Sequence, residues 1–339
     1  MHDQQHSRSA AAPHSLDRRQ LLLAGAAALA GWPAAAQQRQ DWPSRPITLV
    51  AVTPPGGNSD TYLRVLSIPL GEQLKSSVIV ENRPGAGGTL AGKFVLDAGP
   101  DGHVVMGGSG SSHVLYPLLA DNMPYDVQRD FRPVALIGVA YQMLLVRPDS
   151  PFRSVADIIA AAKKSPGTVS FASPGLFGIQ RLAGELFQVR SGVQLVNVPN
   201  VRGSARGDVI GGHVDLMFDS GAEEQVKAGT LRALAVTSRK RDPHFPDVPT
   251  MEEQGVRDFE VTSWAGTFVH ARTPDAIVDR LNRAIVASLG TDAARAKLQS
   301  LGLETPAMDA RQFADFYAQD FRKWAAVVEA QGLKRKMKK

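Results

Sequence analysis

Short apolar runs alternate with amphipathic stretches along most of the chain, and this alternation restricts the fold more than any other feature of the sequence. The amphipathic stretches carry apolar residues at spacings of three and four, as at Val155, Ile158 and Ala162, which is typical of helices. Continuous apolar runs are typical of strands covered on both faces. The pattern therefore predicts an α/β fold in which mostly parallel sheets are flanked by helices. The expected strands are 47–52, 78–80, 104–108, 134–139, 143–146, 169–172, 195–198, 216–218 and 231–236.

The last part of the sequence predicts helices. Pro274 can open one helix, and 293–301 predicts another. Asp309, followed three residues later by Gln312, indicates a capping box at the start of a long helix that Gly332 ends. Aromatic residues recur on one face of this helix, so we expect them in the core rather than at a cofactor. They are Phe313, Phe316, Tyr317, Phe321 and Trp324.

The front of the sequence has the organisation of an export signal. A polar stretch ends in Arg18-Arg19, and the apolar stretch 21–31 that follows is too short to span a bilayer. Three alanines then offer the small residues that a signal peptidase needs. We therefore expect residues 1–36 to be a signal peptide that is cleaved after about Ala36 during export.

The route of export stays open at this stage. The segment from Ser15 to Leu23 resembles a twin-arginine signal, which carries a protein across the membrane already folded. The alternative is an ordinary secretory signal that contains two arginines. No later stretch reaches the roughly 18 apolar residues of a membrane helix, so we expect the mature protein to be soluble. Because the sequence has no cysteine, disulfides, thiolate metal sites and a lipid on an N-terminal cysteine are excluded.

Charge and motif patterns argue against several function classes. The net charge is +5, but five basic residues gather in the last six positions, so the rest is nearly neutral and no binding of nucleic acid is expected. Beyond the signal no histidine pair has the spacing of a helical metal site, so no metal is expected. The dinucleotide fingerprint Gly-x-Gly-x-x-Gly and the nucleophile elbow Gly-x-Ser-x-Gly are both absent. We therefore expect no cofactor.

A glycine-rich turn at 54–60 separates the first expected strand from a helix expected to run to about Leu74. Backbone N–H groups at the start of a helix have no partner within the helix, so such a turn is a generic binding site for anions. The turn therefore predicts contact with a small, negatively charged molecule. The residues expected to make it are Pro55, Gly56, Gly57, Ser59 and Asp60.

Similar turns follow other expected strands. In sheets of parallel strands the carboxyl ends meet at one edge, where ligands bind. We therefore expect these turns to converge on one crevice that offers many N–H and O–H donors and few charges. Each could instead be only a tight turn, because glycine gives the backbone freedom, and Asp219 could be an ordinary helix N-cap. The candidate contact residues are Ser109, Ser111, Ser173, Gly175, Gly178 and Asp219.

Several segments in order resemble the Bug (TctC-type) family, the extracytoplasmic solute-binding proteins of tripartite tricarboxylate transporters. The resemblance covers the chain from about Trp42 to Leu333. The segments include Trp42-Pro43-Ser44-Arg45-Pro46, Pro54-Pro55-Gly56-Gly57, Glu81-Asn82-Arg83-Pro84-Gly85-Ala86-Gly87-Gly88 and Gly211-Gly212-His213-Val214-Asp215-Leu216-Met217-Phe218-Asp219.

The resemblance implies a two-lobed periplasmic-binding-protein fold. One lobe is expected at 41–143 plus 267–339 and the other at 144–266. It further implies a monomeric periplasmic receptor, without enzymatic activity, that closes on a small organic carboxylate and delivers it to the membrane subunits of a transporter. In the family, the turn after the first strand and the turn matching 173–181 hold the ligand's carboxylates.

The second of these turns departs from the family pattern. Its hydroxyl donors are replaced by Gly178, Ile179 and Gln180, and Arg181 stands where the family has a histidine. Arg181 and Arg202 could clamp a carboxylate, or Arg181 could point to solvent while Arg202 caps a helix. The apolar residues of this lobe favour a ligand with an aromatic or aliphatic body and one carboxylate at the Gly56-Gly57 turn. These apolar residues are Leu176, Phe177 and Ile179.

Two alternative functions stay open on the sequence alone. The chain could be a receptor without its own transporter that presents its ligand to a signalling partner. It could also be a periplasmic hydrolase in which Ser111 is the nucleophile and His113 the base.

Overall fold

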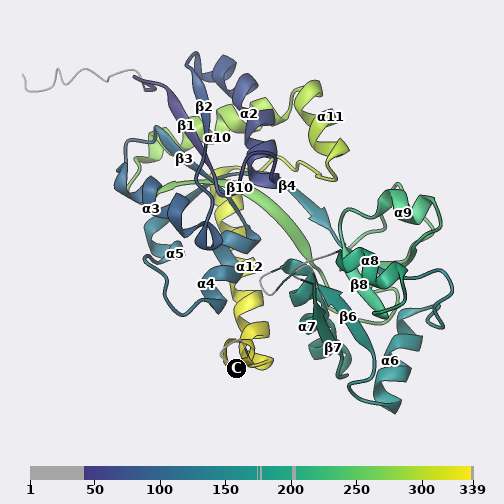
Figure 1. Cartoon of the computed structure of the whole chain (residues 1–339). Coiled ribbons are helices and arrows are strands. Elements are labelled where there is room, and N and C mark those ends of the chain that lie inside the picture. The colour runs from purple at the N-terminus through teal and green to yellow at the C-terminus, as the bar shows by residue number, and fades with distance from the viewer. Residues whose placement is uncertain (1–41, 174, 176–177, 201–203, 337–339) are drawn as a thin grey trace, which may run out of the picture. The chain divides into compact units, whose positions relative to one another are not determined.

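The computed structural model describes residues 42–173, 175, 178–200 and 204–336, and residues from Pro43 onward form one compact unit (Figure 1). Several predictions fall outside the described residues: the signal peptide, the apolar residues Leu176 and Phe177, and Arg202.

The first sheet contains five strands in the order β2-β1-β3-β10-β4. Strands β1, β2 and β3 are parallel, with Thr48 of β1 beside Ile79 and Val104, and β10 runs antiparallel to both β3 and β4. Every strand except β10 therefore points the same way. The strands are β1 (Ile47–Ala51), β2 (Val78–Asn82), β3 (Val104–Ser109), β4 (Phe131–Tyr141) and β10 (Thr262–His270).

The second sheet repeats this arrangement in the order β7-β6-β8-β5-β9. Here β5 is the antiparallel strand, paired with both β8 and β9. The α/β fold with mostly parallel sheets is thus confirmed, and all nine expected strands are present. The strands are β5 (Met143–Val146), β6 (Ser170–Ser173), β7 (Val196–Pro199), β8 (Leu216–Asp219) and β9 (Arg232–Val236).

Helices flank both sheets (Figure 1). The capping box predicted at Asp309 is present, since its carboxylate accepts the Gln312 N–H at 2.7 Å and Gln312 Oε1 accepts the Asp309 N–H. The α-helices are α2 (Asn58–Leu74), α3 (Thr89–Asp97), α4 (Tyr116–Leu119), α5 (Val127–Asp130), α6 (Val155–Lys164), α7 (Ile179–Ser191), α8 (Ala205–Ile210), α9 (Glu223–Lys227), α10 (Asp275–Leu289), α11 (Asp292–Ser300), α12 (Ala310–Ala330) and α13 (Leu333–Lys336), with single turns η1 (Ala86–Gly88) and η2 (Ser111–Leu115).

The aromatic face of α12 packs into the core, as predicted. Phe313, Tyr317 and Trp324 are buried, and the first two lie against Trp264 and Phe268 of β10. The indole N–H of Trp264 donates to Asp320 at 2.8 Å. Strand β10 was not predicted, because threonine, serine and glycine interrupt its apolar residues, although it lies between β3 and β4 and is largely buried.

The chain passes between the two sheets twice, and hydrogen bonds join the two crossings. Gln142, which lies between β4 and β5, donates its N–H to the Thr237 hydroxyl oxygen at 2.9 Å and accepts the Thr237 N–H at 2.9 Å. The Thr237 hydroxyl donates to the Val261 carbonyl at 2.6 Å. These three residues are buried where the two crossings meet. The lobe boundaries near 143 and 266 stay a prediction.

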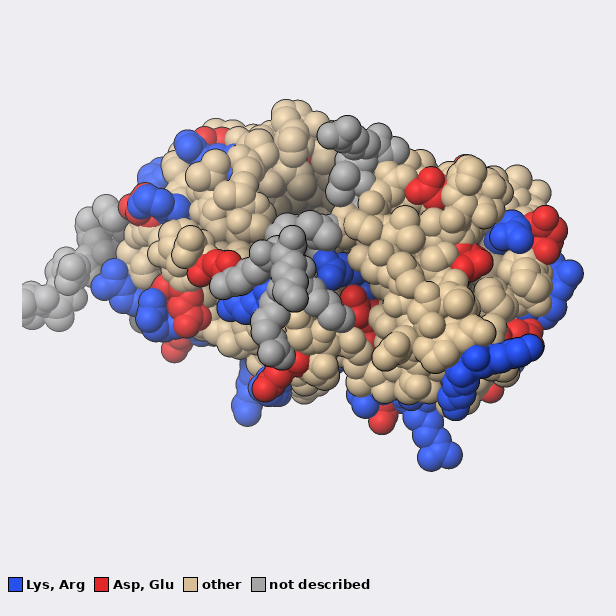
Figure 2. Space-filling model, turned by 60° about the horizontal axis from the view of Figure 1, so that its bottom comes forward, with Lys and Arg blue, Asp and Glu red and all other residues tan. Residues whose placement is uncertain are grey.

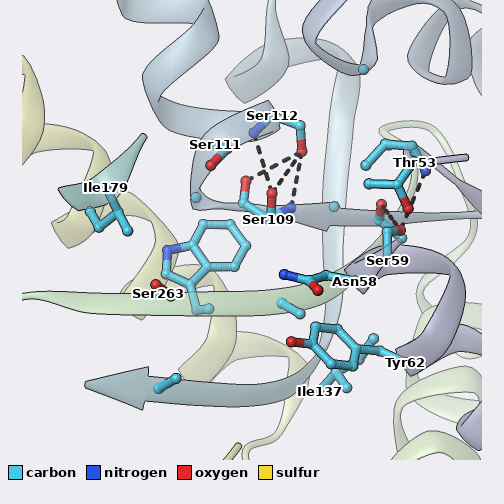
Figure 3. Close-up of a pocket in the computed structure, with 18 of the residues that line it drawn as sticks. Thr53, Asn58, Ser59, Tyr62, Ser109, Ser111, Ser112, Ile137, Ile179 and Ser263 are labelled. Carbon is cyan, nitrogen blue, oxygen red and sulfur yellow. Dashed lines mark hydrogen bonds between the residues drawn. The ribbon is translucent and has the colours of Figure 1, made fainter. Parts of the chain in front are cut away.

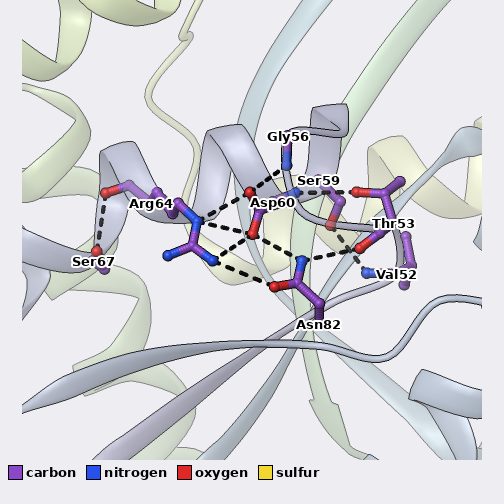
Figure 4. Close-up of polar contacts among 8 residues, drawn as sticks. All are labelled: Val52, Thr53, Gly56, Ser59, Asp60, Arg64, Ser67 and Asn82. Atoms are coloured by element: carbon purple, nitrogen blue, oxygen red, sulfur yellow. Dashed lines mark hydrogen bonds and ion pairs between the residues drawn. The ribbon is translucent and has the colours of Figure 1, made fainter.

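Asp60 holds the turn between β1 and α2 in place (Figure 4). Its side chain is 2% exposed, and its carboxylate accepts the Gly56 N–H at 2.9 Å, the Asn82 amide at 2.8 Å and the Arg64 Nε–H at 2.9 Å. Gly56 has φ of 81°, a backbone conformation that residues other than glycine rarely adopt. The bond from Arg64, helped by those from Gly56 and Asn82, lowers the pKa of Asp60 to about 2 against the effect of burial.

We predict that Asp60→Asn destabilises the protein by about 2 kcal/mol at neutral pH, because charge-assisted hydrogen bonds to a buried carboxylate are lost. Since the pKa of Asp60 is lower in the folded state, its stabilisation is complete above about pH 4 and falls as the pH approaches 2. Urea unfolding of both proteins from pH 7 down to pH 3 should show the difference shrinking.

The matched control is Asp97→Asn, which removes an exposed ion pair of the same i,i+4 spacing, Lys93–Asp97 at 2.9 Å. An exposed pair of this kind contributes little. Equal effects of the two substitutions at pH 7 would contradict the structural role of Asp60.

Candidate functional site

A cavity of about 830 Å³ lies where the ends of β1 and β3 meet the start of α2 (Figure 3). Its lining also includes Ile179 and Gln180 at the start of α7, the segment 219–221 after β8, and the segment 262–265 of β10. Strand ends and helix starts from both sheets therefore contribute to one cavity. This volume suits a small organic molecule.

The start of α2 supplies polar side chains to the cavity wall (Figure 3). Asn58 and Tyr62 lie one helical turn apart and both line the cavity. Within the described part of the chain neither side chain makes a hydrogen bond. Burial raises the pKa of Tyr62 above its ordinary value, so its hydroxyl is protonated at neutral pH and can donate. Gly57 precedes the helix as its N-cap without a capping side chain.

A second polar group follows β3 (Figure 3). The Ser109 N–H donates to the Ser112 hydroxyl oxygen at 3.0 Å, whereas the Ser111 side chain is exposed in the cavity. The backbone here packs too closely for side chains: a Cβ at Gly107 would lie 2.6 Å from Leu63, and one at Gly108 would lie 2.4 Å from His113. The glycines therefore bring the backbone of β3 to the cavity wall.

His113 is buried behind this wall. Its ring stacks on Phe268 with 3.9 Å between ring centroids, and its Nδ1 lies 3.0 Å from the Ser112 hydroxyl. Burial lowers the pKa of His113 to about 3, so it is neutral. The pairing expected for a hydrolase is not found, because Ser112 rather than Ser111 contacts the histidine.

In the opposite part of the cavity, the lining residue Asp219 is paired with Arg206, which lies behind the lining. Asp219 Oδ2 accepts from Arg206 Nε at 2.9 Å and from Arg206 Nη2 at 2.5 Å, while Oδ1 accepts the Gly221 N–H at 3.2 Å. Asp219 lines the cavity and Arg206 does not. Asp219 does not cap an α-helix, because α9 begins after Ala222.

The residues predicted from the sequence fall into two groups. Ser59, Ser109, Ser111 and Asp219 line the cavity. None of the other predicted residues is part of the lining. Pro55, Gly56, Gly57 and Asp60 form the turn after β1, and the Asp60 carboxylate accepts hydrogen bonds from Gly56 and from Asn82 instead of facing the cavity.

The residues of the second turn predicted to hold a carboxylate are not part of the lining, and the polar side chains among them contact other protein groups. Ser173 is fully buried and donates to Asn197 at 2.9 Å or to the Gly175 carbonyl at 3.2 Å. Gly178 is the N-cap of α7. Arg181 is 6% exposed and lies 3.7 Å from Glu185, so the expectation that it points to solvent is wrong.

Sequence reasoning missed several lining residues, among them Asn58, Tyr62, Gln180 and Ser263. Asn58 and Tyr62 could have been found from their i,i+4 spacing at the start of the first helix. Ser263 lies on the strand that was not predicted, and no signal pointed to it.

Charged side chains of both signs are mixed on the face shown in Figure 2. Among the described residues, no group of three or more His, Asp or Glu side chains is placed to hold a metal ion. In the same residues no helix combines the length and apolar character needed to cross a membrane.

Comparison with known proteins assigns the chain to a family. The family model of the tripartite tricarboxylate transporter family receptor, TctC, matches residues 62–333. A protein encoded in the tcbD-tcbE intergenic region of Pseudomonas sp. (strain P51) is 36% identical over 319 residues, covering 93% of this chain and 94% of the relative.

Two solved structures are similar to this chain in both sequence and fold. Rpa4515 of R. palustris, solved with adipate, is 32% identical with a TM-score of 0.71 and covers 86% of this chain and 98% of its own. MatC from Rhodopseudomonas palustris, solved with bound malate, is 29% identical with a TM-score of 0.69 and covers 85% of this chain and all of its own. The fold is thus that of the two-lobed periplasmic binding proteins, and the chain belongs to the TctC family of solute-binding receptors.

Proposed function

We propose that this protein is a periplasmic receptor that captures a small carboxylate-bearing organic anion and delivers it to the membrane subunits of a tripartite tricarboxylate-type transporter. The observation that carries the proposal is the cavity of about 830 Å³ to which the ends of β1 and β3 and the start of α2 contribute polar groups. The two related proteins solved with adipate and malate support a carboxylate as the ligand.

The carboxylate would bind at the first-sheet side of the cavity. Helix α2 begins there without a capping side chain. Among the described residues the N–H groups of Asn58 and Ser59 have no partner and are available to an anion, whereas the Asp60 N–H donates to Thr53 Oγ1 at 3.3 Å. Ser111 adds a hydroxyl group to the lining, whereas the lining hydroxyls of Ser59 and Ser109 already bond to the Gly107 carbonyl and to Ser112. In this proposal the turn of Pro55, Gly56 and Gly57 shapes the site, and Asp60 holds the turn without touching the ligand.

Binding would be coupled to closure of two lobes, at 41–143 plus 267–339 and at 144–266. The lining draws on both sheets, so a ligand satisfies both sets of groups together only in a closed form. A ligand that binds one form better shifts the population toward it. The membrane subunits would then recognise the closed form.

Ligand binding can be tested by thermal unfolding with a panel of mono- and dicarboxylates. A ligand at 100 times its Kd stabilises the native state by about 2.7 kcal/mol, so at least one acid should raise the Tm of the mature protein by several degrees. The variant Gly57→Ala should lose this response, since its Cβ would lie 2.6 Å from Thr53 and displace the turn.

The matched control is Gly290→Ala at the end of α10, where a Cβ meets backbone oxygens at an ordinary 3.4 Å. It should respond to ligand like the parent protein. If no acid shifts the Tm, or if Gly57→Ala responds unchanged, the proposed site is wrong.

Export can be tested by the mass of the protein recovered from the periplasm. Cleavage after Ala36 gives a mature chain that begins at Gln37. Replacing both Arg18 and Arg19 with lysine should stop export by the twin-arginine route and leave a secretory signal active. An exported chain of full length would contradict the predicted signal peptide.

A further inference from the structure

The charges around the cavity restrict what it can hold. Among the described residues of its lining, Asp219 is the one acidic residue, and no lysine, arginine or histidine side chain is part of that lining. A carboxylate that leaves water needs either an opposite charge or several hydrogen-bond donors. In the described lining, an anion can therefore be bound only by uncharged hydrogen-bond donors.

The uncharged donors suffice for one carboxylate. Asn58, Tyr62 and Ser111 all face the cavity from its first-sheet side (Figure 3), and within the described residues their side chains make no other hydrogen bond. The N–H groups of Asn58 and Ser59, the first two of α2, lie on the same side. A carboxylate offers two oxygens with about four acceptor positions, so one such group can be fully satisfied here.

Much of the remaining lining is suited to an uncharged body, although the polar residues Gln180, Ser220 and Ser263 also belong to it. Ile137, Ile179 and Leu303 contribute apolar surface, and Leu301 lines the cavity while 37% exposed. The indole N–H of Trp264 already donates to Asp320, so it presents its ring and not a donor. An apolar ligand body would cover this surface and gain the corresponding hydrophobic free energy.

The Arg206–Asp219 pair opposes a second charge on the ligand. Arg206 gives two N–H groups to Asp219 Oδ2 and so neutralises it, but only the aspartate reaches the cavity. A second ligand carboxylate near 219–221 would meet the carboxylate of Asp219 first. To bind it, Arg206 would have to leave a charge-assisted pair. A ligand ammonium gains little here either, because Asp219 is already paired.

We infer that the ligand is a carboxylic acid with one negative charge and an uncharged, largely apolar body, and that the Arg206–Asp219 pair sets this preference against dicarboxylates. The inference rests on the proposed function and specifies its ligand class.

Isothermal titration of the mature protein with hexanoate and adipate tests the inference, because the two acids have the same chain length and differ in one carboxylate. We expect the Kd of hexanoate to be at least about tenfold lower than that of adipate, because the second carboxylate of adipate would have no compensating charge in the described lining of the cavity. The zwitterion 6-aminohexanoate should bind no better than hexanoate.

The variant Asp219→Asn frees the Arg206 guanidinium and should raise the affinity for adipate about tenfold while changing that for hexanoate less. The converse variant Arg206→Gln leaves Asp219 uncompensated and should weaken hexanoate binding. As a control, Asp149→Asn removes an aspartate that is also paired with an arginine, Arg147 at 2.9 Å, but is exposed and outside the lining. It should change neither affinity.

Tighter binding of adipate than of hexanoate by the parent protein would overturn the inference and leave the proposed function intact. An adipate affinity that is the same in Asp219→Asn as in the parent would overturn the role of the ion pair. If the parent protein, folded by circular dichroism, binds no member of a wider panel of acids, the proposed function itself fails.

Discussion

The cavity depends on one buried carboxylate that is not itself part of the lining. Asp60 joins the turn after β1, the following helix and the neighbouring strand β2 through Gly56, Arg64 and Asn82. Because these bonds are charge-assisted and converge on a buried carboxylate, they fix the direction in which α2 starts. The positions of Asn58, Ser59 and Tyr62 in the cavity wall follow from that direction.

Much of the fold could be predicted because burial leaves a direct trace in the sequence. A strand covered on both faces needs a continuous apolar run, and every run of this kind became a strand. Strand β10 escaped prediction because its contacts are of another kind: the Thr267 hydroxyl bonds to the Ala135 carbonyl, and a Cβ at Gly266 would lie 2.3 Å from Phe313. Polar and small residues there satisfy tertiary contacts that no local pattern reveals.

The site could be predicted only in part, for a related reason. The sequence locates turns at strand ends, and Ser59, Ser109 and Ser111 are found in the cavity wall for that reason. It does not tell which polar side chains use their hydrogen bonds within the protein. Asp60 and Ser173 bond inward, and so does the Ser59 hydroxyl, although Ser59 lines the cavity. Arg181 and Glu185 are an i,i+4 pair that the sequence could have indicated, but their burial follows from the packing of α7, which it does not show.

The absence of cationic side chains from the described lining has a consequence for a receptor that must release what it binds. A guanidinium aimed at a carboxylate gives strong, geometrically demanding binding, and its own burial is costly when the ligand leaves. Hydroxyl, amide and backbone donors can return to water at a much smaller cost. Arg206, which lies behind the lining, is held by Asp219, so its charge is compensated without any contribution from a ligand. The described cavity wall therefore leaves no arginine charge for a ligand to compensate.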